Sequence, residues 1–432
     1  MTENVVYLHG PPAIGHFLRV GASGHRQLEL LHGAGRLGID RVVIEASMVA
    51  RQKDLIAALS ESGVELILDT NIAELSSIGR FEGAVKAAPW SNPNAVLSPD
   101  DLSPTANRDV ISQIARFAIE HRFQAVLAPT HFVQNSTDPL LSVDLRATEA
   151  LRRALDRHGG QAIGIDYNLT IPNAALRDPV QRRAFIAGLA NIPYDNLWLR
   201  VSGFGADATA TGLRRYIATI FDFHSLGHPV VADGVGGLAG LATVAFGAAG
   251  GMCHGVAEKE RFDASSWTKP PTNGGGGGRE KRVLVEGLDR LLSVKQMDLL
   301  MAAPGARRHF SCNDPSCCPR GLDDTRKNPK GHYLKQRQQQ VEALSRVPEL
   351  RRAQHFLEQQ LAPVRQSAQK AAALELADEG LKRMLSANQE RLERTENLLV
   401  VLRSALPQDA RSAPPVRRVG AAGTSSRGRS RP

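Results

Sequence analysis

The sequence predicts an α/β protein that begins with a (β/α)8 barrel of the TIM type and continues into a zinc-binding and α-helical extension. Eight short apolar runs recur along the first part of the chain, and most precede a stretch with helical periodicity. Strands that alternate with helices imply a parallel sheet, and eight such units within roughly 260 residues fit a closed barrel. A doubly wound open sheet is the competing architecture.

The expected strands are short and mostly followed by polar or glycine-containing turns. They are Phe17–Val20, Arg41–Glu45, Val64–Leu68, Gln124–Leu127, Ala162–Ile165, Leu197–Val201, Pro229–Ala232 and Gly251–Cys253. Amphipathic patterns predict helices at 25–37, 54–63, 110–119, 141–155, 180–189, 213–223 and 238–246. A longer connection, residues 71–107, is rich in Pro, Ser and Gly, which favours a lid or substrate loop.

Composition changes along the chain predict four parts. Residues 1–265 form the barrel, with Val5–Leu8 closing its base, and residues 266–282 form a glycine-rich linker or loop. Residues 283–406 form the zinc-binding and helical region, with helical periodicity over 283–301 and a long final helix at 381–402. Residues 407–432 contain mostly Pro, Ser, Gly and Arg, and we expect this basic tail to be disordered.

The overall charge favours an anionic partner. The 432 residues carry a formal net charge of +9, which makes nucleic acid a plausible ligand. No apolar run is long enough to cross a bilayer, so we expect no membrane association. The N-terminal residues lack the pattern of a secretory signal, and the cytoplasm is the expected location.

Polar residues follow most of the expected strands, where a parallel barrel gathers its active site. Several carboxylates, an arginine and two histidines on one rim are sufficient for acid–base or nucleophilic catalysis. Asp233 also precedes a helix, so it is alternatively an N-cap. Gly234 and Gly236 would let backbone amides approach a ligand, or merely allow a tight turn. The rim residues are Glu45, Asp69, Thr70, Thr130, His131, Gln134, Asp166, Tyr167, Asn168, Arg200, Ser202, Asp233 and His254.

A cysteine cluster follows the expected barrel. Cys312, Cys317 and Cys318 lie within seven residues, and His332 follows at the spacing of a zinc finger. In a reducing compartment three thiolates and one imidazole predict a structural zinc site rather than a disulfide. His309 is the alternative fourth ligand, whereas Cys253 is expected to be a buried small residue.

Several of these stretches resemble the tRNA-guanine transglycosylase superfamily, including its DNA-modifying branch. Asp233-Gly-Val-Gly236 and the segment from Gly247 to Met252 are similar to the end of that family's barrel, and Leu68-Asp69-Thr70 is similar to its base-recognition segment. The resemblance implies a (β/α)8 barrel with a Cys3His zinc site. It also implies exchange of guanine for a 7-deazaguanine base in DNA or tRNA through a covalent aspartyl intermediate.

Two positions depart from the family pattern. His254 stands where the family has its nucleophilic aspartate, and the cysteines are spaced Cys-x4-Cys-Cys. If the reaction is retained, Asp69, Asp166 or Asp233 supplies the nucleophile and the general acid/base, or His254 has taken a new role, so these four are the expected catalytic residues. The expected substrate-binding residues of the rim are Thr70, His131, Tyr167, Arg200, Gly234 and Gly236.

Two other functions remain open from the sequence. One is a different barrel hydrolase or lyase that uses the histidines and aspartates of the rim. The other is a catalytically degenerate nucleic-acid-binding subunit whose long C-terminal helices also mediate homo- or hetero-oligomerisation.

Overall fold

A computed structural model describes residues 13–22, 24–36, 38–103, 108–257, 259–270, 280–406 and 412–417. Within this part of the chain, no helix is both long enough and apolar enough to cross a membrane. The run Val5–Leu8, which was expected to close the base of the barrel, and most of the glycine-rich linker lie outside the described residues.

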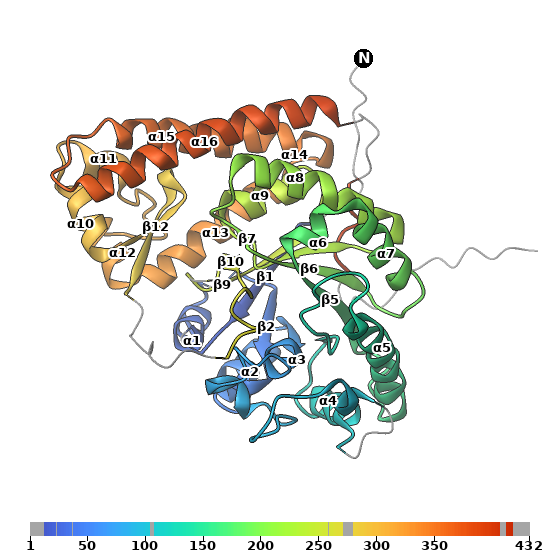
Figure 1. The fold of residues 1–432 in the computed structure, drawn as a ribbon. Helices are drawn as coiled ribbons and strands as arrows, with labels where there is room; N and C mark the ends of the chain where they lie inside the picture. Colours follow the sequence, from blue (N-terminus) through green and yellow to red (C-terminus); the bar gives the residue numbers. More distant parts are fainter. Residues whose placement is uncertain are drawn as a thin grey trace, which may run out of the picture.

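Eight parallel strands close into a barrel in the order β1-β2-β3-β4-β5-β6-β8-β9 (Figure 1). The closed ring confirms the barrel and excludes the open sheet, because β9 pairs with β1. The strands are β1 Gly15–Val20, β2 Arg41–Glu45, β3 Glu65–Asp69, β4 Ala125–Leu127, β5 Gly164–Pro172, β6 Asn196–Ser202, β8 Val230–Asp233 and β9 Gly251–Gly255.

Helices follow most of the strands and cover the outside of the barrel (Figure 1). Side chains that accept hydrogen bonds from backbone amides begin several of them, such as Asp109 before α4 and Asp138 before α5. The covering helices are α1 His25–Gly33, α2 Lys53–Glu61, α4 Val110–Glu120, α5 Pro139–Arg157, α6 Asn173–Arg177, α7 Pro179–Leu189, α8 Ala210–Ile220 and α9 Gly237–Ala245.

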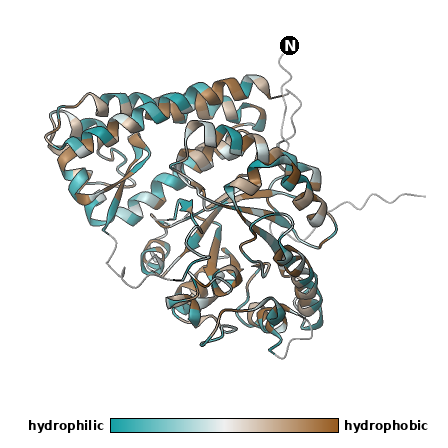
Figure 2. Ribbon diagram, viewed as in Figure 1, coloured by the Kyte–Doolittle hydropathy of each residue, from teal (hydrophilic) through white to brown (hydrophobic). Residues whose placement is uncertain are grey.

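The inside of the barrel is apolar at mid-height. Side chains alternate along each strand, so every second residue faces the interior. Phe17, Val43, Ile67 and Trp198 belong to one buried interior cluster. Figure 2 shows the same preference for hydrophobic residues along the barrel strands. Polar side chains are thereby confined to the two ends of the barrel.

The fifth strand differs from its expected range. It continues to Pro172, whereas the sequence pattern predicted an end at Ile165. Asp166 and Asn168 interrupt the apolar run, but polar residues at alternate positions are compatible with a barrel interior that is polar toward its ends. As a result Asp166 lies near the beginning of the strand rather than just past its end.

The C-terminal region packs beside the barrel and carries the long helix α16, Glu379–Ala405, next to α15, Ala362–Ala372 (Figure 1). Residues 283–301 are not one helix, as the periodicity suggested. They form a hairpin of β11 Arg282–Val285 and β12 Arg290–Ser293, and then helix α10 Val294–Ala302. Asp289 adopts a positive φ of 45° at the turn, which ends any helical path there.

Part of the expected disordered tail is packed against the barrel. Residues 412–417, the C-terminal strap, lie at the end of the barrel where the strands begin. Val416 is buried and belongs to the interior cluster. Ala413 N donates to Gly247 O at 2.8 Å, and Arg417 N donates to Asn196 Oδ1 at 3.0 Å. The prediction of disorder is wrong for these six residues, whereas 407–411 and 418–432 lie outside the described residues.

Candidate active site at the carboxyl ends of the strands

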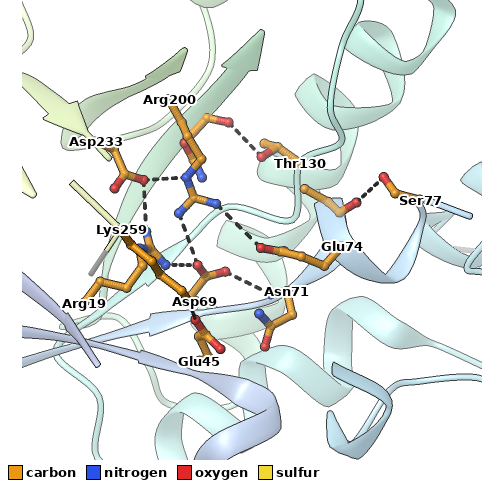
Figure 3. Close-up of polar contacts among 12 residues, drawn as sticks. Arg19, Glu45, Asp69, Asn71, Glu74, Ser77, Thr130, Arg200, Asp233 and Lys259 are labelled. Carbon is orange, nitrogen blue, oxygen red and sulfur yellow. Dashed lines mark hydrogen bonds and ion pairs between the residues drawn. The ribbon is translucent and has the colours of Figure 1, made fainter. Parts of the chain in front are cut away.

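Four charged side chains from four strands meet at the carboxyl end of the barrel (Figure 3). Arg19 pairs with Asp69 and lies 2.9 Å from Asp233, and the Arg200 Nε lies 2.7 Å from Asp233 Oδ2. Arg200 Nη2 also lies 3.3 Å from Asp69 Oδ2. We call these four residues the ion cluster; all four are at most 8% exposed.

The arginines keep both aspartates ionised. Burial by itself raises the pKa of a carboxyl group, but here the nearby guanidinium groups outweigh it. Arg19 and Arg200 lower the pKa of Asp69 to about 2 and hold the pKa of Asp233 below its usual value. The two arginines and the two aspartates of the ion cluster therefore neutralise one another at the carboxyl end of the barrel.

A cavity of about 300 Å³ opens beside the ion cluster. Arg19 is the member of the cluster that lines it. Three further carboxylates, Glu45, Glu74 and Glu82, line the same cavity, and Lys259 Nζ lies 3.0 Å from Glu45 Oε1. Glu45 pairs with a lysine whereas Glu74 is close to Asp69, and carboxylates in different environments are the requirement for paired acid and base chemistry.

Glu74 is the carboxyl group at this cavity whose surroundings favour the protonated form. Burial and the neighbouring Asp69 raise its pKa, and the Arg200 guanidinium at 4.0 Å only partly offsets them. Glu74 Oε2 is buried and has no hydrogen-bond partner among the described residues. A protonated carboxyl group beside a cavity is suited to donate a proton to a leaving group.

Several residues at or near this cavity have strained backbone conformations. Asn71, Ala257 and Lys259 have positive φ angles of 55°, 57° and 59°, a conformation that side chains with a Cβ rarely adopt. Two of the three line the cavity. Asn71 is held there by its backbone N–H, which donates to Asp69 Oδ1 at 2.9 Å. Clustering of such residues is typical of functional sites.

The connection expected to act as a lid or substrate loop covers this end of the barrel. It contains α3 Ile72–Leu75 and two short 3-10 turns, and Glu74, Arg80 and Glu82 line the cavity. Gly79 approaches the segment after the short strand β10, Arg261–Phe262, so closely that a Cβ would lie 2.1 Å from Ser266 O. The loop is therefore packed against its neighbours and forms one wall of the cavity.

Asp166 and Tyr167 do not belong to this site, contrary to the sequence-based assignment. Asp166 accepts hydrogen bonds from Asn196 Nδ2 and Trp198 Nε1, both at 2.8 Å, near the end of the barrel closed by the strap. Burial raises its pKa to about 7. Tyr167 packs against Tyr194, with 6.0 Å between ring centroids, on the opposite side of the strand.

His254 also lies away from the cavity. Its neighbour Cys253 belongs to the interior cluster, so alternation turns the histidine to the outside of β9. There His254 Nδ1 lies 3.0 Å from Tyr333 Oη, and its Nε2 lies 2.9 Å from His16 Nε2. Burial lowers the pKa of His254 to about 4, so the ring is neutral at pH 7. The structure therefore does not bring His254 together with the ion cluster or the cavity.

The predicted glycines serve close packing rather than ligand contact. A Cβ at Gly234 would lie 2.8 Å from Phe262 Cβ, and one at Gly236 would lie 2.6 Å from Glu260 Cγ. Gly234 additionally has a φ of +75°. The turn after β8 is thus covered by residues 260–262, and a ligand does not reach its amides in this arrangement.

Thr70 and His131 are both buried, but neither lies along the cavity. The carbonyl of Thr70 accepts a hydrogen bond from Trp90 Nε1 at 2.9 Å. His131 Nδ1 lies 2.5 Å from Asp144 Oδ1. Neither side chain lines the 300 Å³ cavity. Of the sequence-based rim set, Asp69, Arg200 and Asp233 meet in the ion cluster, and Glu45 lines the cavity.

Three residues of the site were missed from the sequence: Arg19, Glu74 and Lys259. Arg19 offers a signal, since it interrupts the apolar run Phe17–Val20 at an inward-facing position. Glu74 lies in the long connection and Lys259 follows the last strand, so no local pattern marks either residue.

The predicted metal ligands converge in the C-terminal region. The ligand atoms of Cys312, Cys317, Cys318 and His332 all lie within 4.8 Å of one another. His332 Nε2 lies 3.0 Å from Leu284 O, which orients Nδ1 toward the thiols. Three thiolates and one imidazole are the donor set of a structural zinc site, so these residues fit a metal such as zinc. His309 is not a member of the group.

The comparisons with known proteins add little to this geometry. No protein-family model matches the chain, and no curated protein matches it. Among solved structures, the endo-1,4-beta-xylanase XylE of Penicillium canescens has 12% identity and a TM-score of 0.38, over 58% of this chain and 84% of that chain. A class V chitinase of Pseudomonas fluorescens Pf-5 has 10% identity and a TM-score of 0.34, over 69% and 77%. Likenesses this distant carry no inference about activity.

Proposed function

We propose that this protein is a barrel enzyme that cleaves the glycosidic bond of a guanine-type base in DNA or tRNA and exchanges the base. The observation that carries the proposal is the cavity beside the ion cluster, with Glu45 and Glu74 on its wall. The resemblance of Leu68-Asp69-Thr70 and of the Gly-Val-Gly turn to transglycosylases supplies the substrate class. A volume of about 300 Å³ is at the lower end for small-ligand sites and suits a single base.

In this mechanism Glu74 protonates the leaving base. The bond between the base nitrogen and sugar C1′ breaks, its electron pair stays on the base, and the proton of Glu74 neutralises the negative charge that the base acquires. Glu45, held by Lys259, attacks C1′ or stabilises the positive charge that develops there. The ionised Glu74 then removes a proton from the incoming base, which attacks C1′ and releases Glu45. Both carboxylates return to their starting states.

The ion cluster plays a positioning role in this scheme. Asp69 and Asp233 hold the guanidinium groups of Arg19 and Arg200, and Arg19 faces the cavity, where it would contact an anionic part of the substrate. Exposed Arg51, Lys53 and Arg80 lie on the segments after β2 and β3, where they suit a phosphate backbone. A zinc ion held by Cys312, Cys317, Cys318 and His332 would stabilise the fold of the C-terminal region.

A methylated substrate shows whether a Glu74 variant has lost a proton donor or has a generally disrupted site. A 7-methylguanine base carries a positive charge and leaves without protonation. In nucleic acid that contains both bases, Glu74→Gln should release guanine about 10² to 10⁴ times more slowly than wild type but keep most of its activity on 7-methylguanine. Glu45→Gln should lose both activities. Glu61→Gln, on the exposed side of α2, is the matched control. Equal loss of both substrates in Glu74→Gln would rule out the acid role.

A hydrolase is the second candidate, and one observation favours it. The position of the family's nucleophile is occupied by His254, which lies outside the barrel. If water rather than a base is the acceptor, free base accumulates and added guanine is not incorporated. A hydrolase could also use a metal at the rim, but among the described residues the one group of metal-ligand type is the Cys3His cluster.

A further inference from the structure

The metal site and the candidate active site are joined by one helix, α13, Pro329–Ser345. Asn328 caps this helix, since its side chain accepts a hydrogen bond from Gly331 N at 2.9 Å. His332, in the first turn, directs Nδ1 toward Cys317 Sγ at 3.4 Å and Cys318 Sγ at 3.5 Å. A metal bound there would fix the beginning of α13 relative to the cysteine loop.

The residues that follow His332 on α13 hold one glutamate of the barrel. Tyr333 Oη donates to Glu260 Oε1 at 2.8 Å, and Arg337 Nε donates to the same oxygen at 2.9 Å. Tyr333 and Arg337 are four residues apart, so they project from the same face of the helix. All three side chains are at most 9% exposed, so solvent hardly screens these contacts.

Glu260 in turn anchors the segment that borders the cavity. Its carbonyl accepts hydrogen bonds from Ala206 N at 2.8 Å and Gly236 N at 3.2 Å. The preceding residue, Lys259, reaches Glu45 on the cavity wall. The position of Glu260 therefore determines where Lys259 lies and how the turn after Asp233 is packed.

Arg337 also reaches the same turn by a second route. Its Nη1 donates to Asp289 Oδ1 at 2.8 Å, and Asp289 Oδ2 accepts a hydrogen bond from Leu238 N at 3.0 Å. Leu238 is in the first turn of α9, directly after the glycine turn. Through the buried guanidinium group of Arg337, helix α13 thus contacts the segment that contains Glu260 and, by way of Asp289, the beginning of α9.

We propose that metal binding at the Cys3His group positions the cavity wall through α13, with Tyr333, Arg337 and Glu260 as the positioning residues. The contacts themselves do not depend on the reaction, and only the consequence for catalysis rests on the proposed function. The metal would act at a distance, because the ligands lie in the C-terminal region and Lys259 lies at the barrel rim.

Hydrogen exchange of the full chain tests this coupling without an activity assay. Zinc-loaded and chelator-treated protein are compared by mass spectrometry on peptides that cover 255–267 and, as an internal reference, 139–157. Removal of zinc should speed exchange in 255–267 by about tenfold, the change expected for a lost hydrogen bond to a charged group, and leave 139–157 unchanged. Unchanged exchange in 255–267, with the cysteine loop loosened, would overturn the proposal.

Two variants test the same coupling without removal of the metal, in case the metal-free chain unfolds. Tyr333→Phe and Arg337→Gln, both loaded with one zinc per chain, should exchange 255–267 faster than wild type. In a chain that stays folded, they should respond less to the chelator. Tyr194→Phe is the matched control, because the Tyr194 hydroxyl has no hydrogen-bond partner among the described residues. If zinc-loaded Tyr333→Phe and Arg337→Gln exchange like wild type, α13 does not transmit the effect. If the coupling holds but no base is released, the proposed function fails and this inference stands.

Discussion

Arg19 is a buried arginine that pairs with both aspartates of the ion cluster. An arginine inside a buried strand has a large desolvation cost, which Asp69 and Asp233 offset with ion pairs. The same arrangement makes the site sensitive to loss of any one charge, since the remaining partners would be buried without neutralisation.

Replacing Arg19 should therefore destabilise the fold as well as the activity. We expect Arg19→Met to lower the free energy of unfolding by about 3 to 5 kcal/mol, because Asp69 and Asp233 lose a shared partner while they stay buried. Urea unfolding followed by far-UV circular dichroism measures this loss. Arg51→Met, at an exposed position, should change stability by less than about 0.5 kcal/mol. Similar stability of the two variants would show that the ion cluster is not a buried network.

Asp166 gives the protein a pH-dependent stability term at the opposite end of the barrel. Burial raises its folded pKa to about 7 from 3.8, so the unfolded chain releases this proton first as pH rises. The contribution is complete below pH 3.8, declines through the range up to about 7, and is lost above it.

The difference between Asp166→Asn and wild type isolates that term from other groups. Between pH 5 and pH 6.5 the stability of wild type relative to the variant should fall by up to about 1.4 kcal/mol per pH unit. Guanidinium unfolding at several pH values measures the slope. A difference that stays constant across this range would mean that Asp166 is ionised in the folded protein.

At the scale of elements, the C-terminal strap is the part whose role was least visible in the sequence. Composition alone predicted disorder, because Pro, Gly, Ser and Arg dominate the tail. The strap is ordered because four glycines leave room for it. A Cβ at Gly15 or Gly251 would lie less than 3 Å from Val416, and a Cβ at Gly247 or Gly250 would collide with Ser412 or Pro414.

Truncation tests whether the strap supports the barrel. Removal of residues 412–432 should lower the free energy of unfolding by about 2 to 4 kcal/mol, mostly through exposure of Val416 and the surfaces it covers. Removal of residues 418–432 alone is the matched control and should leave stability nearly unchanged. Thermal unfolding of the two truncated proteins, compared with the full chain, decides between a structural strap and a dispensable tail.

The secondary structure could be predicted where the periodicity of the apolar residues was strong. The prediction failed where the turn or the tertiary environment decides the conformation. Seven strands of the barrel lie within two residues of their expected ranges, because buried parallel strands leave short apolar runs. The hairpin β11–β12 was mistaken for helix, since its apolar residues satisfy both periods and only the turn at Asp289 separates them. The long β5 was cut short because its interior polar residues resembled a strand end.

At the scale of the whole molecule, the sequence predicted the closed barrel and the convergence of the Cys3His residues. It predicted the catalytic rim only in part. The assignment assumed that the first polar residue after an apolar run marks the carboxyl end of a strand, which holds for Asp69 and Asp233 but not for Asp166. It also could not tell the inside of β9 from the outside, where His254 packs against Tyr333. Glu74 lies in α3, shortly after Asp69 and β3, but no local sequence pattern marks it as part of the site.

Base exchange on nucleic acid tests the central claim most directly. Zinc-loaded protein is incubated with radiolabelled guanine and either unfractionated tRNA or duplex DNA, and the label in the recovered nucleic acid is counted. We predict incorporation by wild type into one of the two nucleic acids, and a loss of at least about 10² in rate for Glu74→Gln and Glu45→Gln. Release of free base without incorporation would identify a hydrolase instead. Neither incorporation nor release with either nucleic acid would contradict the proposed function.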